Sequence, residues 1–254
     1  YLKEIDEIYY IDYRSKSPLN SNLENIFDLI NESNKSYNFI PNNFDEKKFD
    51  ILDTGYKASA IPGTVAGLLE AHSKFGRLSL ELILQPAIKQ AREGIKVTYD
   101  FHKAIESTPR LLEDKESRTI YFNNGSPLQE NTIIKFPDLA NTIELISSEG
   151  RNGFYKGITA EKIVKAMKEN DGLFSLDDFY NYEAHVRKPI STNYRDNIIY
   201  TSGAPSGGGI TFLTALNILN NFDLKQYQSN SITTYHLLSE ALRRGHNNRS
   251  SEVG

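Results

Sequence analysis

The feature that most constrains the fold of this chain is a β-hairpin that leads directly into a glycine-rich turn and an apolar helix. Residues 188–202, KPISTNYRDNIIYTS, hold two runs rich in Ile, Thr and Tyr around a polar turn at 195–197, which predicts two antiparallel strands. The turn APSGGG (204–209) then leads into ITFLTALNILNNF (210–222), which is too apolar for an exposed helix. A sheet covered by a buried helix is typical of an α+β fold or a layered α/β sandwich.

Most of the remaining chain has the periodicity of amphipathic helices. The segment SLELILQPAIKQAREG (79–94) predicts a helix that begins at the N-cap residue Ser79 and ends at Gly94. Its Pro86 predicts a kink, or a break into two helices. Further helices are expected at 138–150, at 159–172, at 175–182 (opened by a capping box of Ser175 and Asp178) and at 231–248.

The first part of the chain is less regular. Residues 1–13 alternate apolar and polar side chains and predict a hairpin, and residues 22–31 predict a short amphipathic helix. Residues 31–54 are rich in Asn and irregular, which indicates an excursion over the surface. Because no repeat or separating linker is visible, residues 1–254 are expected to form a single domain.

The stretch SAIPGTVAGLLEAH (59–72) predicts the end of a strand over 57–61, a Pro-Gly turn and a helix. Small residues, Gly63, Ala66 and Gly67, stand at the start of that helix, although glycine costs about 1 kcal/mol of helix stability against alanine. We interpret them as residues that let the backbone pack closely against a sheet, and not as part of an active site. The apolar face is expected to consist of Val65, Leu68, Leu69 and His72.

The composition excludes several classes of protein. A net charge of -4 argues against a nucleic-acid partner, and no apolar run approaches the roughly 18 residues of a membrane span. The chain has no cysteine, which excludes disulfides, thiolate metal sites and a cysteine nucleophile. No metal site is expected either, because the histidines lack the spacing of metal ligands: His72, His102, His185, His236 and His246.

None of the local motifs forms a complete catalytic set. The APSGGG turn is not a phosphate-binding loop, because no Gly-Lys-Ser/Thr follows and Phe212 stands where a dinucleotide fingerprint has its last glycine. It is interpreted as a tight turn with close backbone approach. Ser206 lies outside the G-x-S-x-G frame of a nucleophile elbow, and the acidic pairs at 45–46 and 177–178 give no support for a two-carboxylate hydrolase.

Arg14 is the one candidate binding residue. In IDYRSKSP it follows the end of a predicted strand and precedes a loop that contains Pro18. An arginine there can offer a bidentate fork to a carboxylate. On the residues alone, an exposed loop arginine without a ligand is the commoner alternative.

Several long blocks of the chain resemble the γ-glutamyltransferase family. They extend from Lys57 to the end and follow one another in the order and at the spacing of that family. The longest is SAIPGTVAGLLEAHSKFGRLSLELILQPAIKQAREGIKV, where a Pro-Gly turn opens a small-residue helix that an L-x-x-P-A-I-x-x-A-x-x-G run follows. The others are GFYKGITAEKIVKAM, DGLFSLDDFYNYEAHVRKPI, YRDNIIYTSGAPSGGG and SEALRRGHNNRS.

This resemblance implies the N-terminal-nucleophile hydrolase fold, a four-layer αββα sandwich, of which this chain is the large-subunit part. In that family a precursor cleaves itself, and a Thr at the new N-terminus of the small subunit attacks a γ-glutamyl amide such as glutathione. The family's Thr-Thr-His-type segment and its Gly-rich N-terminal region have no match here, so no catalytic residue is expected in this chain, and the small subunit is its expected partner. No cofactor is implied.

The resemblance also assigns Arg14. The family has an arginine in an R-E-x-A-P-type loop that pairs with the α-carboxylate of the substrate, and RSKSP places Arg14 there. The loop departs from the family pattern at Ser15, where the family has Glu, and at Ser17, where it has Ala. Arg14 is therefore the expected substrate-binding residue.

Two alternatives to a γ-glutamyltransferase activity stay open, an enzyme of the same fold with another acyl group and a relative without catalysis. An acylase of β-lactam side chains, or an enzyme that processes poly-γ-glutamate, would share the fold and change the acyl group. A non-catalytic binding relative would have lost self-cleavage. The location stays open between cytoplasm, periplasm and the outside of the cell.

Overall fold

The structure is a computed structural model that describes residues 1–21 and 55–252. These residues pack as two compact units, each described here by itself. The single domain expected over residues 1–254 stays a prediction. Unit 1 comprises Tyr1–Arg14 and Glu183–Gly254, and unit 2 comprises Ser15–Tyr182.

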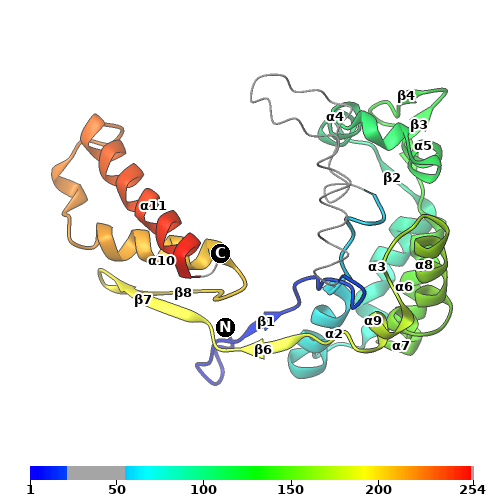
Figure 1. The fold of residues 1–254 in the computed structure, drawn as a ribbon, viewed down its shortest axis with the longest axis horizontal. Helices are drawn as coiled ribbons and strands as arrows, with labels where there is room; N and C mark the ends of the chain where they lie inside the picture. The colour runs from blue at the N-terminus through cyan, green and yellow to red at the C-terminus, as the bar shows by residue number, and fades with distance from the viewer. Residues whose placement is uncertain (22–54, 253–254) are drawn as a thin grey trace. The chain divides into compact units, whose positions relative to one another are not determined.

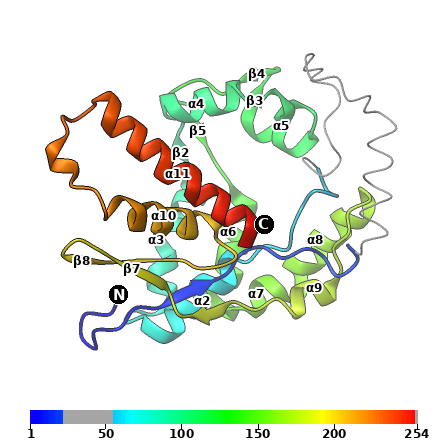
Figure 2. The same ribbon diagram turned by 60° about the vertical axis from the view of Figure 1, so that its left-hand side comes forward.

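Unit 1 contains the predicted hairpin and the two helices that cover it. Strands β7 (Ile190–Tyr194) and β8 (Asn197–Thr201) are antiparallel, with Tyr194 opposite Asn197. Helix α10 (Gly207–Leu219) packs on β7, and α11 (Ile232–Glu252) packs against α10 at an angle (Figures 1 and 2). The predicted hairpin, the buried helix and the last helix are therefore confirmed.

The interior of this unit lies between α10 and α11. Ala215, Leu219 and Ala241 are buried there, and Ala241 is fully inaccessible. The hairpin contributes Tyr194 to the same cluster. Thr192 on β7 also bonds to the amide oxygen of Asn217 on α10, so both apolar and polar contacts join the sheet to the helix. The other partly buried members are Ile218, Leu224, Leu237 and Leu238.

The APSGGG turn permits close backbone approach, as predicted. Gly209 is buried in the first turn of α10, and a Cβ atom there would lie 2.0 Å from the backbone oxygen of Ser202. No heavy atom lies within 4 Å of the corresponding position on Gly208. Two adjacent glycines of one helix turn thus have opposite steric environments.

We expect Gly209→Ala to lower the free energy of unfolding by about 2 kcal/mol, because the new methyl group meets a backbone atom that cannot rotate away. The matched control is Gly208→Ala, which should raise stability by about 0.5–1 kcal/mol through helix propensity. Urea denaturation of the two variants side by side measures the difference. Equal midpoints for both would contradict this account.

The start of the chain pairs with a distant strand. Strand β1 (Tyr10–Asp12) is antiparallel to β6 (His185–Arg187), with Tyr10 opposite Arg187 and Asp12 opposite His185. The hairpin expected over residues 1–13 is wrong: residues 3–6 turn, and a single bridge joins Leu2 to Glu7. The alternating pattern was that of a strand, but it carried no information about the partner.

In unit 2, helix α3 (Leu80–Glu93) begins and ends where the sequence predicts. The Ser79 hydroxyl accepts a hydrogen bond from the backbone N–H of Leu82 at 3.3 Å. Gly94 follows at φ 99°, a conformation that favours glycine. Pro86 lies inside one continuous helix, so of the two alternatives, a kink or a break, the break into two helices is wrong.

The helices of unit 2 pack one on the next, α3 on α6, α6 on the short α7, and α7 on α8 (Figure 1). The Nε of Arg92 on α3 donates to Glu144 on α6 at 3.0 Å. The predicted capping box is present at the start of α9, where Ser175 and Asp178 each bond to the other's backbone. The bounds are α6 (Pro137–Glu149), α7 (Asn152–Tyr155), α8 (Gly157–Glu169) and α9 (Leu176–Tyr180).

Helix α2 (Thr64–Phe75) is buried through its small residues, and the neighbour that the structure places there is Tyr155 of α7, not the sheet that was expected. Ala66 and Gly67 are its buried residues, whereas Leu68, which was expected on the apolar face, is 59% exposed. The strand expected over 57–61 is reduced to one bridge between Ile61 and Lys16.

The remaining elements of the described chain are short. Strands β2 and β5 pair, as do β3 and β4, and both pairs are antiparallel. The helix expected over 22–31 and the excursion expected over 31–54 lie outside the described residues. None of the described helices combines the length and the apolar character needed to cross a membrane. The bounds are β2 (Ile95–Lys96), α4 (Tyr99–Glu106), η1 (Pro109–Leu112), α5 (Lys115–Tyr121), β3 (Phe122–Asn123), β4 (Ser126–Pro127), β5 (Ile133–Ile134) and η2 (Leu224–Gln226).

Candidate functional site

Arg14 lies two residues beyond the end of β1 and is exposed. Its backbone N–H donates to Oδ1 of Asp12 at 3.2 Å, the side-chain-to-backbone bond of an Asx turn. This bond sets the direction in which the chain leaves the strand. The side chain of Arg14 therefore starts from a backbone position that Asp12 holds.

Asp12 is a buried acid, with only 7% of the residue exposed. Its second carboxylate oxygen, Oδ2, accepts a hydrogen bond from Nε of Arg187 on β6 at 2.8 Å. Because His185 is directly opposite Asp12, Arg187 is its diagonal neighbour across the ribbon, within reach of a long side chain. One carboxylate thus joins the two strands and also holds the turn that carries Arg14.

The same charges act on Tyr10, at the other end of β1. Burial raises the pKa of the Tyr10 phenol above its ordinary value, and the negative charge of Asp12 raises it further. Arg187 and Arg14 oppose this shift and lower the pKa. Asp12, Arg14 and Arg187 are therefore one electrostatic group at the β1–β6 ribbon, with two cations around one buried anion.

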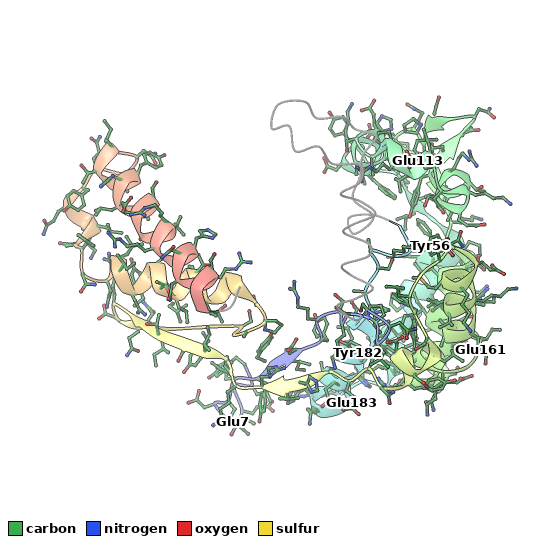
Figure 3. The ribbon with its side chains drawn as sticks, in the orientation of Figure 1. Glu7, Tyr56, Glu113, Glu161, Tyr182 and Glu183 are labelled. Atoms are coloured by element: carbon green, nitrogen blue, oxygen red, sulfur yellow. The ribbon has the colours of Figure 1, made fainter. Side chains whose placement is uncertain are left out.

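The residues of the RSKSP loop that follow Arg14 belong to unit 2, and contacts within that unit hold them. Lys16 and Ile61 exchange two backbone hydrogen bonds, of 3.2 and 2.8 Å. The Lys16 ammonium lies 5.0 Å from the ring centre of Tyr182, a cation–π contact; Tyr182 is labelled in Figure 3. The backbone N–H of Leu19 donates to Asp178 Oδ1 at 2.6 Å, so the loop residues after Arg14 are also fixed by named bonds.

The arrangement around Arg14 suits the binding of an anion. A guanidinium offers a planar fork of N–H donors that matches a carboxylate. Within residues 1–21 and 55–252, no three His, Asp or Glu side chains gather as a metal site requires. A guanidinium in this position can therefore recognise and orient an anionic group.

The other residues considered from the sequence have structural roles where they are described. Nε2 of His72 lies 2.8 Å from the backbone oxygen of Leu78, in agreement with a hydrogen-bonded histidine, although the residue is only half-buried. Ser206 is the N-cap residue of α10. Asp178 belongs to the capping box of α9, and the pair 45–46 lies outside the described residues.

Sequence reasoning missed Asp12 and Arg187. They are separated by 175 positions, so no local spacing connects them. A charged residue in a run of apolar strand residues, IYYIDY, was the one local signal for Asp12.

Comparison with known proteins gives a consistent result. The chain matches the family described as Gamma-glutamyltranspeptidase over residues 3–254. It is 36% identical over 203 residues to the Glutathione hydrolase proenzyme of Escherichia coli (strain K12), across 79% of this chain and 35% of that protein. It is 34% identical over 190 residues to the Acylase ACY 1 proenzyme of Pseudomonas sp. (strain SE83), across 74% of this chain and 34% of that protein. The chain thus spans about a third of the length of these curated relatives.

Among solved structures, the gamma-glutamyltranspeptidase of Helicobacter pylori superimposes with a TM-score of 0.84 at 29% sequence identity. The match covers 98% of this chain and 68% of that chain. It confirms the predicted N-terminal-nucleophile hydrolase fold. Within the described residues the sheets are two-stranded antiparallel ribbons.

Proposed function

Because this chain belongs to the gamma-glutamyltranspeptidase family, we propose that it is the large-subunit portion of an enzyme that cleaves γ-glutamyl amides such as glutathione. The observation that carries the proposal is the position of Arg14, whose backbone is held by Asp12 at the end of β1. Arg14 would bind the α-carboxylate of the donor through two parallel hydrogen bonds. A γ-glutamyl donor that is bound through its α-carboxylate has its γ-carbonyl carbon at a fixed distance from Arg14. Such positioning lowers a reaction barrier by several kcal/mol.

The nucleophile is proposed to be a threonine of a small subunit that the same precursor supplies. Its hydroxyl adds to the γ-carbonyl carbon, its own α-amine takes the hydroxyl proton, and the amide C–N bond breaks as the amine leaves with a proton. The resulting γ-glutamyl ester passes to water or to an acceptor amine. The reaction is an acyl transfer without a change of oxidation state, so it needs no redox cofactor.

The exposed face of the β7–β8 hairpin in unit 1 is an argument for a partner subunit. Thr192 and Tyr194 face α10, so alternate residues of the hairpin face the other way. On that second face Ile198 is 59% exposed and Tyr200 is 46% exposed. We propose that the small subunit covers this face, and that residues 1–254 form a single domain.

The test uses the full-length precursor that contains this chain. We expect two polypeptides on a denaturing gel after maturation, and release of the chromogenic amine from a γ-glutamyl anilide. A precursor that stays intact and releases no amine would favour the non-catalytic alternative and overturn the proposal.

The 34% identity to the Acylase ACY 1 proenzyme supports a second candidate, an acylase of the same fold. The two candidates differ in the acyl group that Arg14 must hold. A γ-glutamyl group carries an α-carboxylate beside an α-amine, whereas an acylase substrate carries a different acyl chain on a β-lactam nucleus. Assaying the matured enzyme with an acylated β-lactam beside the γ-glutamyl anilide distinguishes them by the ratio of the two kcat/KM values.

A further inference from the structure

We propose that Asp12 and Arg187 are positioning residues that aim Arg14 at the carboxylate of the donor. This inference rests on the proposed function and extends it. It assigns the selection of donors with a free α-carboxylate to a three-residue group, Arg14 with Asp12 and Arg187, in which Arg14 alone touches the substrate.

The geometry of the Asp12 carboxylate supports this assignment. Oδ2 accepts from Arg187 Nε at 2.8 Å, and Oδ1 accepts from the backbone N–H of Arg14 at 3.2 Å. One carboxylate oxygen thus bonds across the ribbon to β6, and the other bonds along the chain to the turn at Arg14. A rotation of the carboxylate that weakened one bond would also weaken the other, so the orientation of Arg187 and the turn at Arg14 are linked.

The ribbon itself gives Arg14 little support. Strands β1 and β6 each have three residues, and a ribbon of two such strands is marginal without further contacts. All three residues of β6 are exposed. The ion pair from Arg187 to a buried acid is therefore one specific contact that joins the end of β1 to its partner strand.

The charges also explain why the Asp12–Arg187 pair would improve the binding of a donor carboxylate by Arg14, and why Asp12 would not compete with that carboxylate for the Arg14 guanidinium. Asp12 is buried and bonded to Arg187 and to a backbone N–H, and none of these bonds uses the guanidinium of Arg14. Arg187 adds a second positive charge to the group, so an approaching anion meets two cations and one shielded anion. A guanidinium carried on a backbone that is held in place loses less conformational freedom on binding than one carried on a mobile turn.

The experiment compares Asp12→Asn with the wild type in the full-length, matured enzyme. Asparagine keeps one oxygen for the Arg14 N–H but loses the charge that binds Arg187. We expect kcat/KM for a γ-glutamyl anilide to fall on the order of 10-fold, with most of the change in KM, because a misplaced Arg14 guanidinium binds the α-carboxylate of the donor less tightly. For a 4-aminobutyryl anilide, which lacks the α-carboxylate, Asp12→Asn should leave kcat/KM unchanged.

A double-mutant cycle provides the decisive readout. In an Arg14→Ala background, Asp12→Asn should cause no further loss, since it acts through Arg14. Arg243→Gln is the matched control, because it removes an exposed arginine–carboxylate pair of the same unit, with Glu240, and should leave both substrates unaffected.

Equal losses from Asp12→Asn in the wild-type and Arg14→Ala backgrounds would overturn the positioning role, and so would wild-type kinetics in the single variant. If Asp12→Asn does not mature, Arg187→Gln takes its place under the same criteria, because the Arg187 side chain is half exposed and tolerates replacement more easily. Failure of the proposed function has a different signature: the wild-type enzyme itself would not cleave the γ-glutamyl anilide.

Discussion

Replacing Arg14 by alanine is expected to lower kcat/KM for a γ-glutamyl anilide about 100-fold. Two charge-assisted hydrogen bonds to the α-carboxylate would be lost, and hydrogen bonds to charged groups contribute about 1.5–3 kcal/mol each. A loss of about 3 kcal/mol in transition-state binding corresponds to roughly 100-fold in rate. The donor carboxylate would also lie in the site without its cation, which raises the cost of binding.

Arg14→Lys separates charge from geometry. Lysine keeps the positive charge but cannot form the planar two-point contact, so we expect a loss of about 10-fold, between alanine and the wild type. Because Arg14 is exposed, both variants should keep the wild-type free energy of unfolding within about 0.5 kcal/mol. An alanine variant whose kcat/KM stays within about threefold of the wild type would remove Arg14 from the site.

The sequence predicted those elements whose boundaries are set by local chemistry. Ser79 and Gly94 delimit α3 because one hydroxyl satisfies a free N–H and one glycine adopts φ 99°. Ser175 and Asp178 open α9 by the same local logic. Such signals depend on residues within a few positions of each other, and this is why one sequence suffices to find them.

The faces of helices were less predictable than their ends. The apolar residues of α2 suggested a core face that includes Leu68, yet the helix buries Ala66 and Gly67. Close packing selects the smallest side chains where a large neighbour must fit, and here the neighbour is Tyr155. Hydrophobicity alone does not reveal that a large partner comes from elsewhere in the chain.

Long-range pairing was the least predictable feature. The alternation in residues 1–13 correctly indicated a strand, but β1 pairs with β6, far along the chain. The Asp12–Arg187 contact follows from that pairing and could not be found without it. Arg14 itself was identified by resemblance to a family, since an exposed arginine after a strand has no distinguishing local pattern.

Tyr155→Ala is expected to have the largest effect on stability, a loss of about 3–5 kcal/mol in the free energy of unfolding. Tyr155 is fully buried, and its ring stacks on Tyr182 with centroids 5.6 Å apart and planes 6° apart. The guanidinium of Arg151 lies 4.6 Å from the centre of the same ring. Alanine would leave a cavity in the middle of this group, and urea denaturation of the full-length protein measures the cost.

The hydroxyl of Tyr155 makes a separate contribution, which Tyr155→Phe isolates. It donates to the backbone oxygen of Pro62 at 2.8 Å and accepts from the backbone N–H of Ala66 at 3.2 Å. The N-cap residue of α2, Gly63, has no side chain to bond the first N–H groups, so Tyr155 serves as a cap from a distant helix. Phenylalanine would leave one buried and one partly buried backbone group without this partner, at a cost of about 1–3 kcal/mol.

The pH dependence of stability provides an independent check on the buried hydroxyl. Burial raises the pKa of Tyr155 from 10.0 to about 12, although the Ala66 N–H partly opposes the shift. Below pH 10 the Tyr155 phenol is protonated in the folded and in the unfolded chain, so its hydroxyl makes its full contribution to the free energy of unfolding. Between about pH 10 and 12 the unfolded chain loses this proton while the folded chain keeps it, so stability falls as the pH rises. We therefore expect the stability difference between wild type and Tyr155→Phe to be constant below pH 10 and to shrink above it; a difference that stays constant up to pH 12 would contradict the burial of an uncharged phenol at this position.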